Sequence, residues 1–265
     1  MQRLISLASG TLPEFDPVAV VHAAAEGGFG GCGIWFDAES WTQKTTSAVA
    51  QAFAQTGLTP LEIEVIAVEP GAANPDHERL LESGAAIGAT ECIVVSADPD
   101  LGAFTARFAE ICEIGERVGI NICLEFLPIY QVSDLPTALG VLEQVAHSRG
   151  RLLLDPVHVA RAGATLDELR AVPQALLSFA QFCDAPADLP GERTFENLLN
   201  EAVDGRLNPG RGALPLAELL DILPQGLPLS LEMRSKALRD TFADPAQRAR
   251  NVYDDTMSFL QSVSR

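Results

Sequence analysis

The stretch RLLLDPVHVAR (residues 151–161) runs from three leucines into an aspartate, which a histidine and then an arginine follow at three-residue spacing. A short apolar run of this kind is typical of a strand buried on both faces, as in a parallel sheet covered by helices. Ionisable residues are rarely buried without a partner, so Asp155 late in this run needs an explanation. The stretch therefore predicts a buried parallel strand that ends on a carboxylate with a specific role.

The rest of the chain repeats this pattern, because short apolar runs alternate with alanine-rich amphipathic stretches, as in βα units. Strands are expected at residues 3–9, 31–36, 61–68, 91–97, 121–127, 151–157, 176–183 and 228–234. Helices are expected at residues 17–26, 42–56, 75–88, 101–118, 135–147, 166–173, 216–223 and 245–263. Eight units of about 33 residues favour closure into a barrel, and the glycine-rich fingerprint of an open doubly wound sheet does not follow the first strand. We expect an α/β fold, a single (β/α)8 TIM barrel over residues 1–265.

The composition excludes several partners. The chain has 36 acidic and 18 basic side chains, and its net charge of -18 repels nucleic acid and anionic membranes. Five cysteines without a C-x-x-C spacing support neither a disulfide framework nor a zinc knuckle, which indicates a cytoplasmic setting. We expect neither a signal peptide nor a membrane-spanning helix, because no apolar run is long enough. A small-molecule substrate fits this surface, and a homo-oligomer is compatible with it.

Four consecutive expected strands each carry one polar residue late in the run. These residues are Glu125, Asp155, Gln181 and Glu232. Side chains late in barrel strands meet at the C-terminal mouth, where the active sites of TIM barrels lie. Carboxylates gathered there repel each other unless a cation holds them, and hard oxygen ligands suit Mg²⁺ or Mn²⁺. The alternative is that each acid caps a helix or pairs with an arginine.

The residues after Asp155 suggest further site members. His158 is expected as an acid/base or as a substrate contact, and Arg161 either clamps an anionic group or pairs with Asp155. A long connection, residues 184–213, is rich in Pro, Gly and charge, and is expected to cover the substrate as a lid or wall. Its segment GRLNPGRGALPL presents Arg206 and Arg211, which either bind a carboxylate or phosphate or balance surface charge.

Three other features have weaker implications. Glu62 and Glu64 alternate on the third strand and share one face, which points either into the barrel or toward a helix. Trp35 ends the second strand at the same mouth, as an aromatic wall for a sugar or as ordinary packing. Cys183 has no histidine near it in sequence, so we expect it to pack rather than to react.

The segments CLEFLP, LLLDPVHVAR, FAQFCDA, RLNPGRGALPL and LSLEM, within residues 123–233, resemble those of the xylose-isomerase-like TIM barrels, the sugar phosphate isomerase/epimerase or endonuclease IV-like superfamily. The resemblance implies one divalent ion, Mn²⁺ or Mg²⁺ with Zn²⁺ or Co²⁺ as alternatives, bound by Glu125, Asp155, Gln181 and Glu232. It also implies that Glu125 and Glu232 shuttle a proton next to a substrate carbonyl, through an enediolate held on the metal.

The sequence departs from the commonest family pattern at its seventh strand. Sugar epimerases usually have a histidine ligand where this chain has Gln181, and the related 3-dehydroshikimate dehydratases are similar to it in having glutamine. We therefore expect a metal-dependent isomerase or epimerase of a sugar-like hydroxy-carbonyl compound, with a dehydratase-type lyase acting on a hydroxy acid as the alternative. A non-catalytic barrel is a further alternative. An endonuclease is disfavoured, since four histidines and a net charge of -18 supply neither its metal ligands nor a DNA-binding surface.

Overall fold

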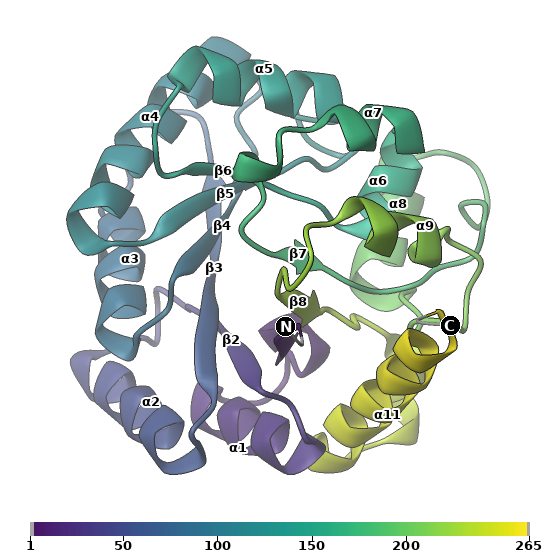
Figure 1. Cartoon of the computed structure of the whole chain (residues 1–265). Coiled ribbons are helices and arrows are strands. Elements are labelled where there is room, and N and C mark those ends of the chain that lie inside the picture. Colours follow the sequence, from purple (N-terminus) through teal and green to yellow (C-terminus); the bar gives the residue numbers. More distant parts are fainter. Residues whose placement is uncertain (1–2, 264–265) are drawn as a thin grey trace.

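The computed structural model describes residues 3–263 and forms one barrel of parallel strands surrounded by helices (Figure 1). The strands are β1 (Ile5–Leu7), β2 (Gly31–Trp35), β3 (Thr59–Val68), β4 (Glu91–Ser96), β5 (Asn121–Glu125), β6 (Gly150–Leu153), β7 (Ala180–Gln181) and β8 (Leu229–Leu231). Their order in the sheet is β6-β5-β4-β3-β2-β1-β8-β7. The Gln181 N–H donates to the Leu154 carbonyl oxygen at 3.0 Å, and this bond links the two ends of the sheet. The fold is the expected (β/α)8 barrel.

Helices follow the strands and cover the outside of the barrel. They are α1 (Pro17–Gly27), α2 (Gln43–Thr56), α3 (Pro75–Ile87), α4 (Leu101–Val118), α5 (Leu135–Val145), α6 (Pro156–Ala162), α7 (Leu166–Ala171), α8 (Phe195–Asp204), α9 (Leu216–Ile222), α10 (Lys236–Thr241) and α11 (Pro245–Val263). Local sequence explains their ends. The Asp16 carboxylate accepts the first free N–H groups of α1, and Gly28 ends that helix in the left-handed conformation at φ 98°.

Three of these helices were not expected from the sequence, and several strands are shorter than expected, β7 most of all. The helix α6 begins directly after Asp155, whose carboxylate accepts N–H groups of its first turn. The helix α8 lies within the long connection, and α10 follows β8. The strand β7 keeps two residues of the expected 176–183, and a 3-10 turn (Gln174–Leu176) overlaps the first residue of that range.

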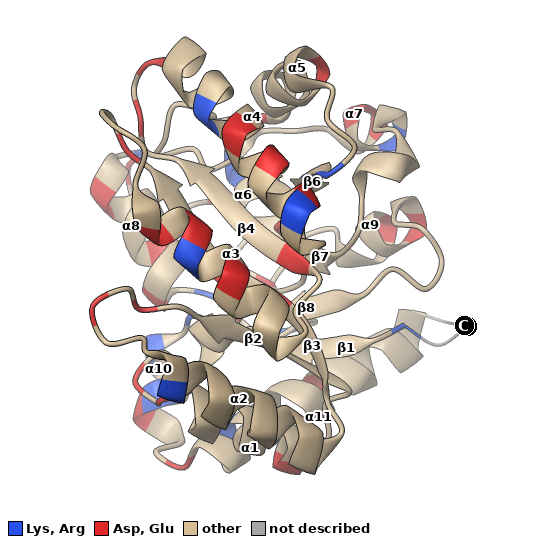
Figure 2. Ribbon diagram, turned by 90° about the vertical axis from the view of Figure 1, so that its left-hand side faces the viewer, with Lys and Arg blue, Asp and Glu red and all other residues tan. Residues whose placement is uncertain are grey.

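Apolar side chains fill two layers. The larger lies between the strands and the helices, and the smaller lies inside the barrel, where Leu61, Ile93, Cys123, Leu153 and Phe179 contact one another. Acidic residues outnumber basic ones over the outer helices (Figure 2), in keeping with the net charge of -18. Within residues 3–263, none of the helices has the length and apolarity needed to cross a bilayer.

Candidate metal centre and active site

The four polar residues expected at the barrel mouth meet there. Glu125 and Gln181 end β5 and β7, Glu232 follows β8 directly, and Asp155 caps the helix after β6. Gln181 Nε2 donates to Glu232 Oε2 at 3.1 Å. All four are buried, with exposed fractions between 1% and 6%. Three carboxyl groups and one amide therefore share a space that water barely reaches.

Asp155 has both carboxylate oxygens occupied by donors. Its Oδ1 accepts from the backbone N–H groups of Val157 at 2.8 Å and His158 at 3.1 Å, which begins α6. Its Oδ2 accepts from Arg206 Nη1 at 2.5 Å. Burial alone would raise the pKa of Asp155, but the charge of Arg206 and these hydrogen bonds lower it below its ordinary value. Asp155 is therefore an anion at neutral pH.

Arg206 lies among the acids rather than on the surface of the long connection. Its Nη1 bridges Asp155 Oδ2 and Glu232 Oε2, the latter at 3.0 Å, and its Nε donates to the Ala202 carbonyl of α8 at 2.8 Å. Burial would lower its pKa, but the surrounding carboxylates, Asp155 and Glu232 foremost, raise it well above the ordinary value. Arg206 is a permanent cation in this centre.

Arg206, together with Arg234 at 3.7 Å from Glu232, does not balance the charge of the site. Five acidic side chains are buried at or below the mouth: Glu62, Glu64, Glu125, Asp155 and Glu232. Burial, and then the charges of Asp155 and Glu232, raise the pKa of Glu125 well above its ordinary value. A group of buried carboxyls with too little positive charge is the environment that a divalent cation stabilises.

The amide of Gln181 adds a donor atom suited to such an ion. Its Oε1 is buried and, among the described residues, has no hydrogen-bond partner. A buried polar atom without a partner costs free energy, about 1–3 kcal/mol, so its presence calls for a ligand. Amide and carboxylate oxygens are the ligands that Mg²⁺ and Mn²⁺ prefer, and the donor set of Glu125, Asp155, Gln181 and Glu232 fits either ion.

His158 lies beside this donor set. Its Nε2 is 3.7 Å from Glu125 Oε1 and 3.4 Å from Arg206 Nη2. Ligand atoms of Glu125, Asp155 and His158 all lie within 4.8 Å of one another. Burial lowers the pKa of His158 more than Asp155 raises it, so the imidazole is neutral at pH 7.

Two further acids, Glu62 and Glu64 of β3, point into the barrel. The sequence had left open whether they point into the barrel or toward a helix. Ser230 donates to the Glu62 carboxylate from β8, and Ser9 donates to Glu64 from the turn after β1. Burial and the charge of Glu232 raise the pKa of Glu64 to about 7. Glu64 is thus a carboxyl group next to the proposed ligands that exchanges its proton near neutral pH.

Arg161 and Arg211 have protein partners away from the acids of the centre. Arg161, which was expected to clamp an anion or to pair with Asp155, instead forms a two-pronged ion pair with Glu201 of α8, each contact at 2.7 Å. Arg211 pairs with Asp255 of α11 at 2.6 Å, and 65% of its side chain is exposed. Of the three expected substrate arginines, the structure brings only Arg206 to the carboxylates.

The long connection, residues 184–213, is held to the rest of the chain near both of its ends. Arg161 also donates to the carbonyls of Pro186 and Ala187, at 2.7 and 2.9 Å. Asp184, at the start of the connection, accepts from the backbone N–H groups of Gly210, Gly212 and Leu214. These contacts hold both ends of the segment that carries Arg206. Cys183 beside it is buried, and burial raises the pKa of its thiol well above its ordinary value, so it is a poor nucleophile.

Sequence reasoning missed Gly10 and Arg234. A methyl group at Gly10 would lie 2.5 Å from Glu232 Oε1 and 2.8 Å from Arg234 Nε, so a larger residue would force these two side chains to shift. The Arg234 Nε lies 3.7 Å from Glu232 Oε1. A position two residues after a mouth glutamate was the signal that could have found Arg234, since alternate residues of an extended segment face the same side.

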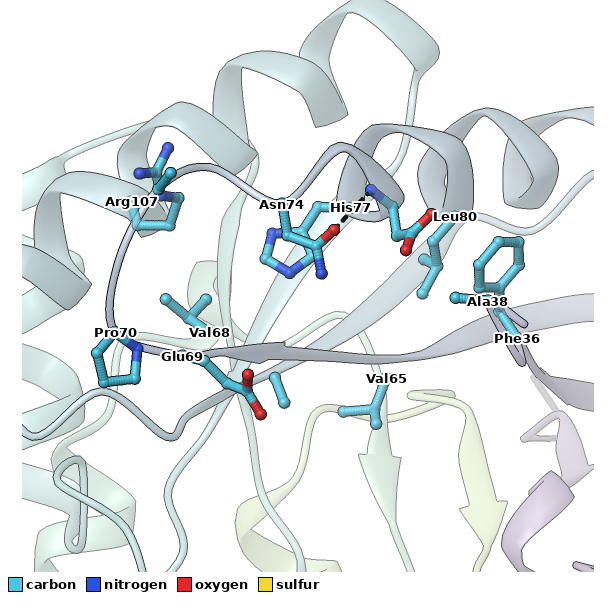
Figure 3. A pocket seen from close by; sticks show the side chains of 13 residues that line it. Phe36, Ala38, Val65, Val68, Glu69, Pro70, Asn74, His77, Leu80 and Arg107 are labelled. Atoms are coloured by element: carbon cyan, nitrogen blue, oxygen red, sulfur yellow. Dashed lines mark hydrogen bonds between the residues drawn. The ribbon is translucent and has the colours of Figure 1, made fainter.

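Two hollows adjoin the rim of the barrel. One, of about 680 Å³, lies beside β1 and β2 and is lined in part by Ser9, Gly10, Trp35 and Arg234. The other, of about 300 Å³, lies between the end of β3 and the start of α3 (Figure 3). Its labelled side chains come from β3, α3, α4, the loop between β3 and α3, and the residues after β2, whereas the four proposed ligands lie at the ends of β5 to β8. Ser9 and Arg234, in the lining of the first hollow, lie against Glu64 and Glu232, so this hollow adjoins the acids.

A parallel barrel with acids gathered at its C-terminal mouth defines the TIM-barrel class of folds, in which this mouth is where active sites lie. More particularly, the chain belongs to the Xylose isomerase-like TIM barrel family, which it matches over residues 21–263. No curated protein matches the sequence significantly. The chain spans 42% of a xylose isomerase-like TIM barrel/4-hydroxyphenylpyruvate dioxygenase fusion protein, with 96% of its own length matched, 20% identity and a TM-score of 0.81.

Three other solved structures share the fold over nearly their whole length. The IOLI protein, crystallised with a bound zinc atom, has a TM-score of 0.79 and 18% identity over 97% of this chain and 99% of that one. A D-psicose 3-epimerase from Clostridium cellulolyticum H10, solved with D-tagatose, has a TM-score of 0.70 and 15% identity over 97% of this chain and 99% of that one. A probable 3-DHS dehydratase from Bacillus anthracis has a TM-score of 0.72 and 16% identity over 96% of this chain and 99% of that one.

Proposed function

We propose that the chain is a divalent-metal-dependent isomerase or epimerase that acts on a small, sugar-like hydroxy-carbonyl compound. The observation that carries this proposal is the buried donor set in which Gln181 Oε1 has no partner among residues 3–263 and three carboxylates lie beside it. Glu125, Asp155, Gln181 and Glu232 would hold the ion, with Mn²⁺ or Mg²⁺ favoured by the oxygen ligands and Zn²⁺ or Co²⁺ as alternatives. The zinc-bound fold neighbour supports a divalent ion in general.

The chemistry needs a proton to leave and return at the carbon next to a carbonyl. The bound ion would polarise that carbonyl and so acidify the neighbouring C–H. Glu125 ends β5 and Glu232 follows β8; one would remove the proton on one face of the substrate, and the other would return it on the opposite face. His158 is a neutral imidazole that can hold a substrate hydroxyl, and Arg206 adds a fixed positive charge.

A second candidate is a lyase of the 3-dehydroshikimate dehydratase type, which Gln181 and the dehydratase among the fold neighbours favour. It would use the same first step. A glutamate removes the proton next to the carbonyl, and the hydroxyl on the following carbon then leaves as water when a nearby acid protonates it. Isomerase and lyase therefore differ in the fate of the substrate hydroxyl, not in the metal centre.

The experiment supplies Mn²⁺-loaded protein with D-tagatose in D₂O and, separately, with 3-dehydroshikimate. The proposal expects an epimerised ketose that carries one deuterium at the inverted carbon, and no protocatechuate. Protocatechuate from 3-dehydroshikimate without ketose epimerisation would establish the lyase instead. Glu125→Gln serves as the control, since it should abolish either activity if the barrel mouth is the site.

A further inference from the structure

Arg234 is a cation at the barrel mouth whose hydrogen-bonding capacity is unused. Its guanidinium lies over the ring of Trp35, 5.5 Å from the ring centroid, and donates no hydrogen bond to any residue between 3 and 263. Its side chain is 24% exposed. By contrast, Arg161, Arg206 and Arg211 are each bound to carboxylates of the protein. Arg234 is therefore the mouth arginine left free to bind an anion from solution.

A hollow large enough for a small metabolite opens beside Arg234. It measures about 680 Å³, and its lining includes Arg234, whose Nε lies 3.7 Å from the proposed ligand Glu232, and Ser9, which donates to Glu64. Trp35, 41% exposed, supplies a flat apolar wall. Acids also line this hollow, but they have partners. Glu14 pairs with Arg248 at 2.6 Å, and Asp16 and Asp37 accept from nearby N–H and hydroxyl groups.

We propose that Arg234 and Trp35 form a subsite for an anionic oxygen group of the substrate, a carboxylate or a phosphate. This inference rests on the proposed function, because it takes the reacting carbon to lie at the neighbouring carboxylates. Arg234 Nε is 3.7 Å from Glu232 Oε1, so the anionic group lies a few bonds from the carbon whose proton Glu232 handles. A planar guanidinium binds such groups through two parallel N–H donors, and Trp35 holds its plane.

Neutralising the charge of Glu232 does not account for the position of Arg234. Arg206 already contacts Glu232 at 3.0 Å, which is closer than the 3.7 Å of Arg234. An arginine kept only to neutralise Glu232 would gain by donating a hydrogen bond to it. Arg234 instead lies over the aromatic ring at the edge of the hollow, in a position from which it can reach a ligand.

The test titrates Mn²⁺-loaded protein with three probes by calorimetry: D-tagatose, D-tagatose 6-phosphate and 3-dehydroshikimate. The wild type should bind at least one anionic probe about 10-fold or more tightly than D-tagatose. In Arg234→Gln this preference should vanish, while the affinity for D-tagatose should change by less than about 2-fold. Which anionic probe loses affinity in the variant distinguishes a carboxylate from a phosphate.

Arg170→Gln is the matched control, because it removes one exposed arginine, 54% accessible, that pairs with Asp167 on α7. The Arg170→Gln protein should still bind the anionic probe more tightly than D-tagatose. A wild type that binds neither anionic probe more tightly than D-tagatose would overturn the subsite, as would a preference that survives in Arg234→Gln. Manganese content measured on the same samples separates the two proposals. A metal-free wild type contradicts the proposed function, whereas full metal occupancy without charge preference contradicts only the subsite.

Discussion

Gln181 donates from Nε2 to Glu232 Oε2 at 3.1 Å, and this bond fixes the amide so that Oε1 remains without a partner among the described residues. One side chain thus orients a carboxylate and offers an oxygen ligand of its own. Histidine at this position would offer a nitrogen instead. The amide therefore makes the proposed donor set all-oxygen, which bears on both the metal and the reaction.

Replacing Gln181 with leucine should weaken divalent-metal binding about 10- to 100-fold, because it removes a ligand and the donor that orients Glu232. Gln181→His should keep the metal but shift preference toward Zn²⁺, which imidazole nitrogen suits better than amide oxygen. Calorimetric titration with Mn²⁺ and Zn²⁺ checks both variants. Unchanged Mn²⁺ affinity in Gln181→Leu would remove Gln181 from the donor set.

Replacing His158 with alanine should lower turnover about 100-fold or more while changing metal affinity little, because the imidazole lies beside the donor set and would contact the substrate rather than the ion. Turnover per bound metal, from activity and elemental analysis of one sample, is the measurement. Loss of metal with unchanged turnover per bound ion would make His158 a ligand.

The buried ion pair between Arg161 and Glu201 should dominate the stability of the long connection. Its side chains are 5% and 3% exposed, so Arg161→Met leaves Glu201 as a buried, unpaired charge and should lower the free energy of unfolding by about 3–5 kcal/mol. Urea unfolding measures the difference. Lys236→Met is the control, since its pair with Asp240 is 65% and 63% exposed and should change stability by under about 1 kcal/mol.

In that pair, the double variant Arg161→Met/Glu201→Met should be more stable than Arg161→Met alone, since no charge remains buried without a partner. A double variant that is less stable than the single one would show that Glu201 stabilises the fold through contacts other than its ion pair with Arg161.

Stability of the metal-free protein should fall as the pH rises from about 4.5 to 7. Glu64 has its pKa raised from 4.5 to about 7, so over this range the folded state holds a proton that the unfolded chain has lost. Protonated Glu64 contributes fully to the free energy of unfolding below its pKa in the unfolded chain. This contribution, about 3 kcal/mol, is lost once the pH has risen to its pKa in the folded protein. Urea unfolding in EDTA at pH 5 and 8 should show a smaller fall for Glu64→Gln. Equal falls in both proteins would contradict this origin.

The positions of the four donors could be predicted because strand order determines them. Consecutive parallel strands end at one rim, so Glu125 and Asp155, late in neighbouring runs, had to lie near each other. The helix α6 was not predicted, although an aspartate followed by proline is a common helix start. The reason is that Asp155 also ends an apolar run that is typical of a strand.

The place of Arg206 could not be predicted, because contacts between distant residues determine it. Arg161 and Glu201 are 40 residues apart and hold α8 against α6, while Asp184 and Gly212 are 28 apart and hold the far end of the connection. Sequence patterns report local periodicity and do not report such pairings. The free guanidinium of Arg234 likewise depends on where Trp35 and Gly10 lie.

The most direct measurement is anomalous diffraction from crystals of the protein soaked in Mn²⁺. The account predicts one strong manganese peak within coordination distance of Glu125, Asp155, Gln181 and Glu232, and its loss in Glu232→Gln crystals. Full manganese occupancy at another place, such as the exposed group of Glu113, Glu116 and His147, with no peak among the four, would contradict it.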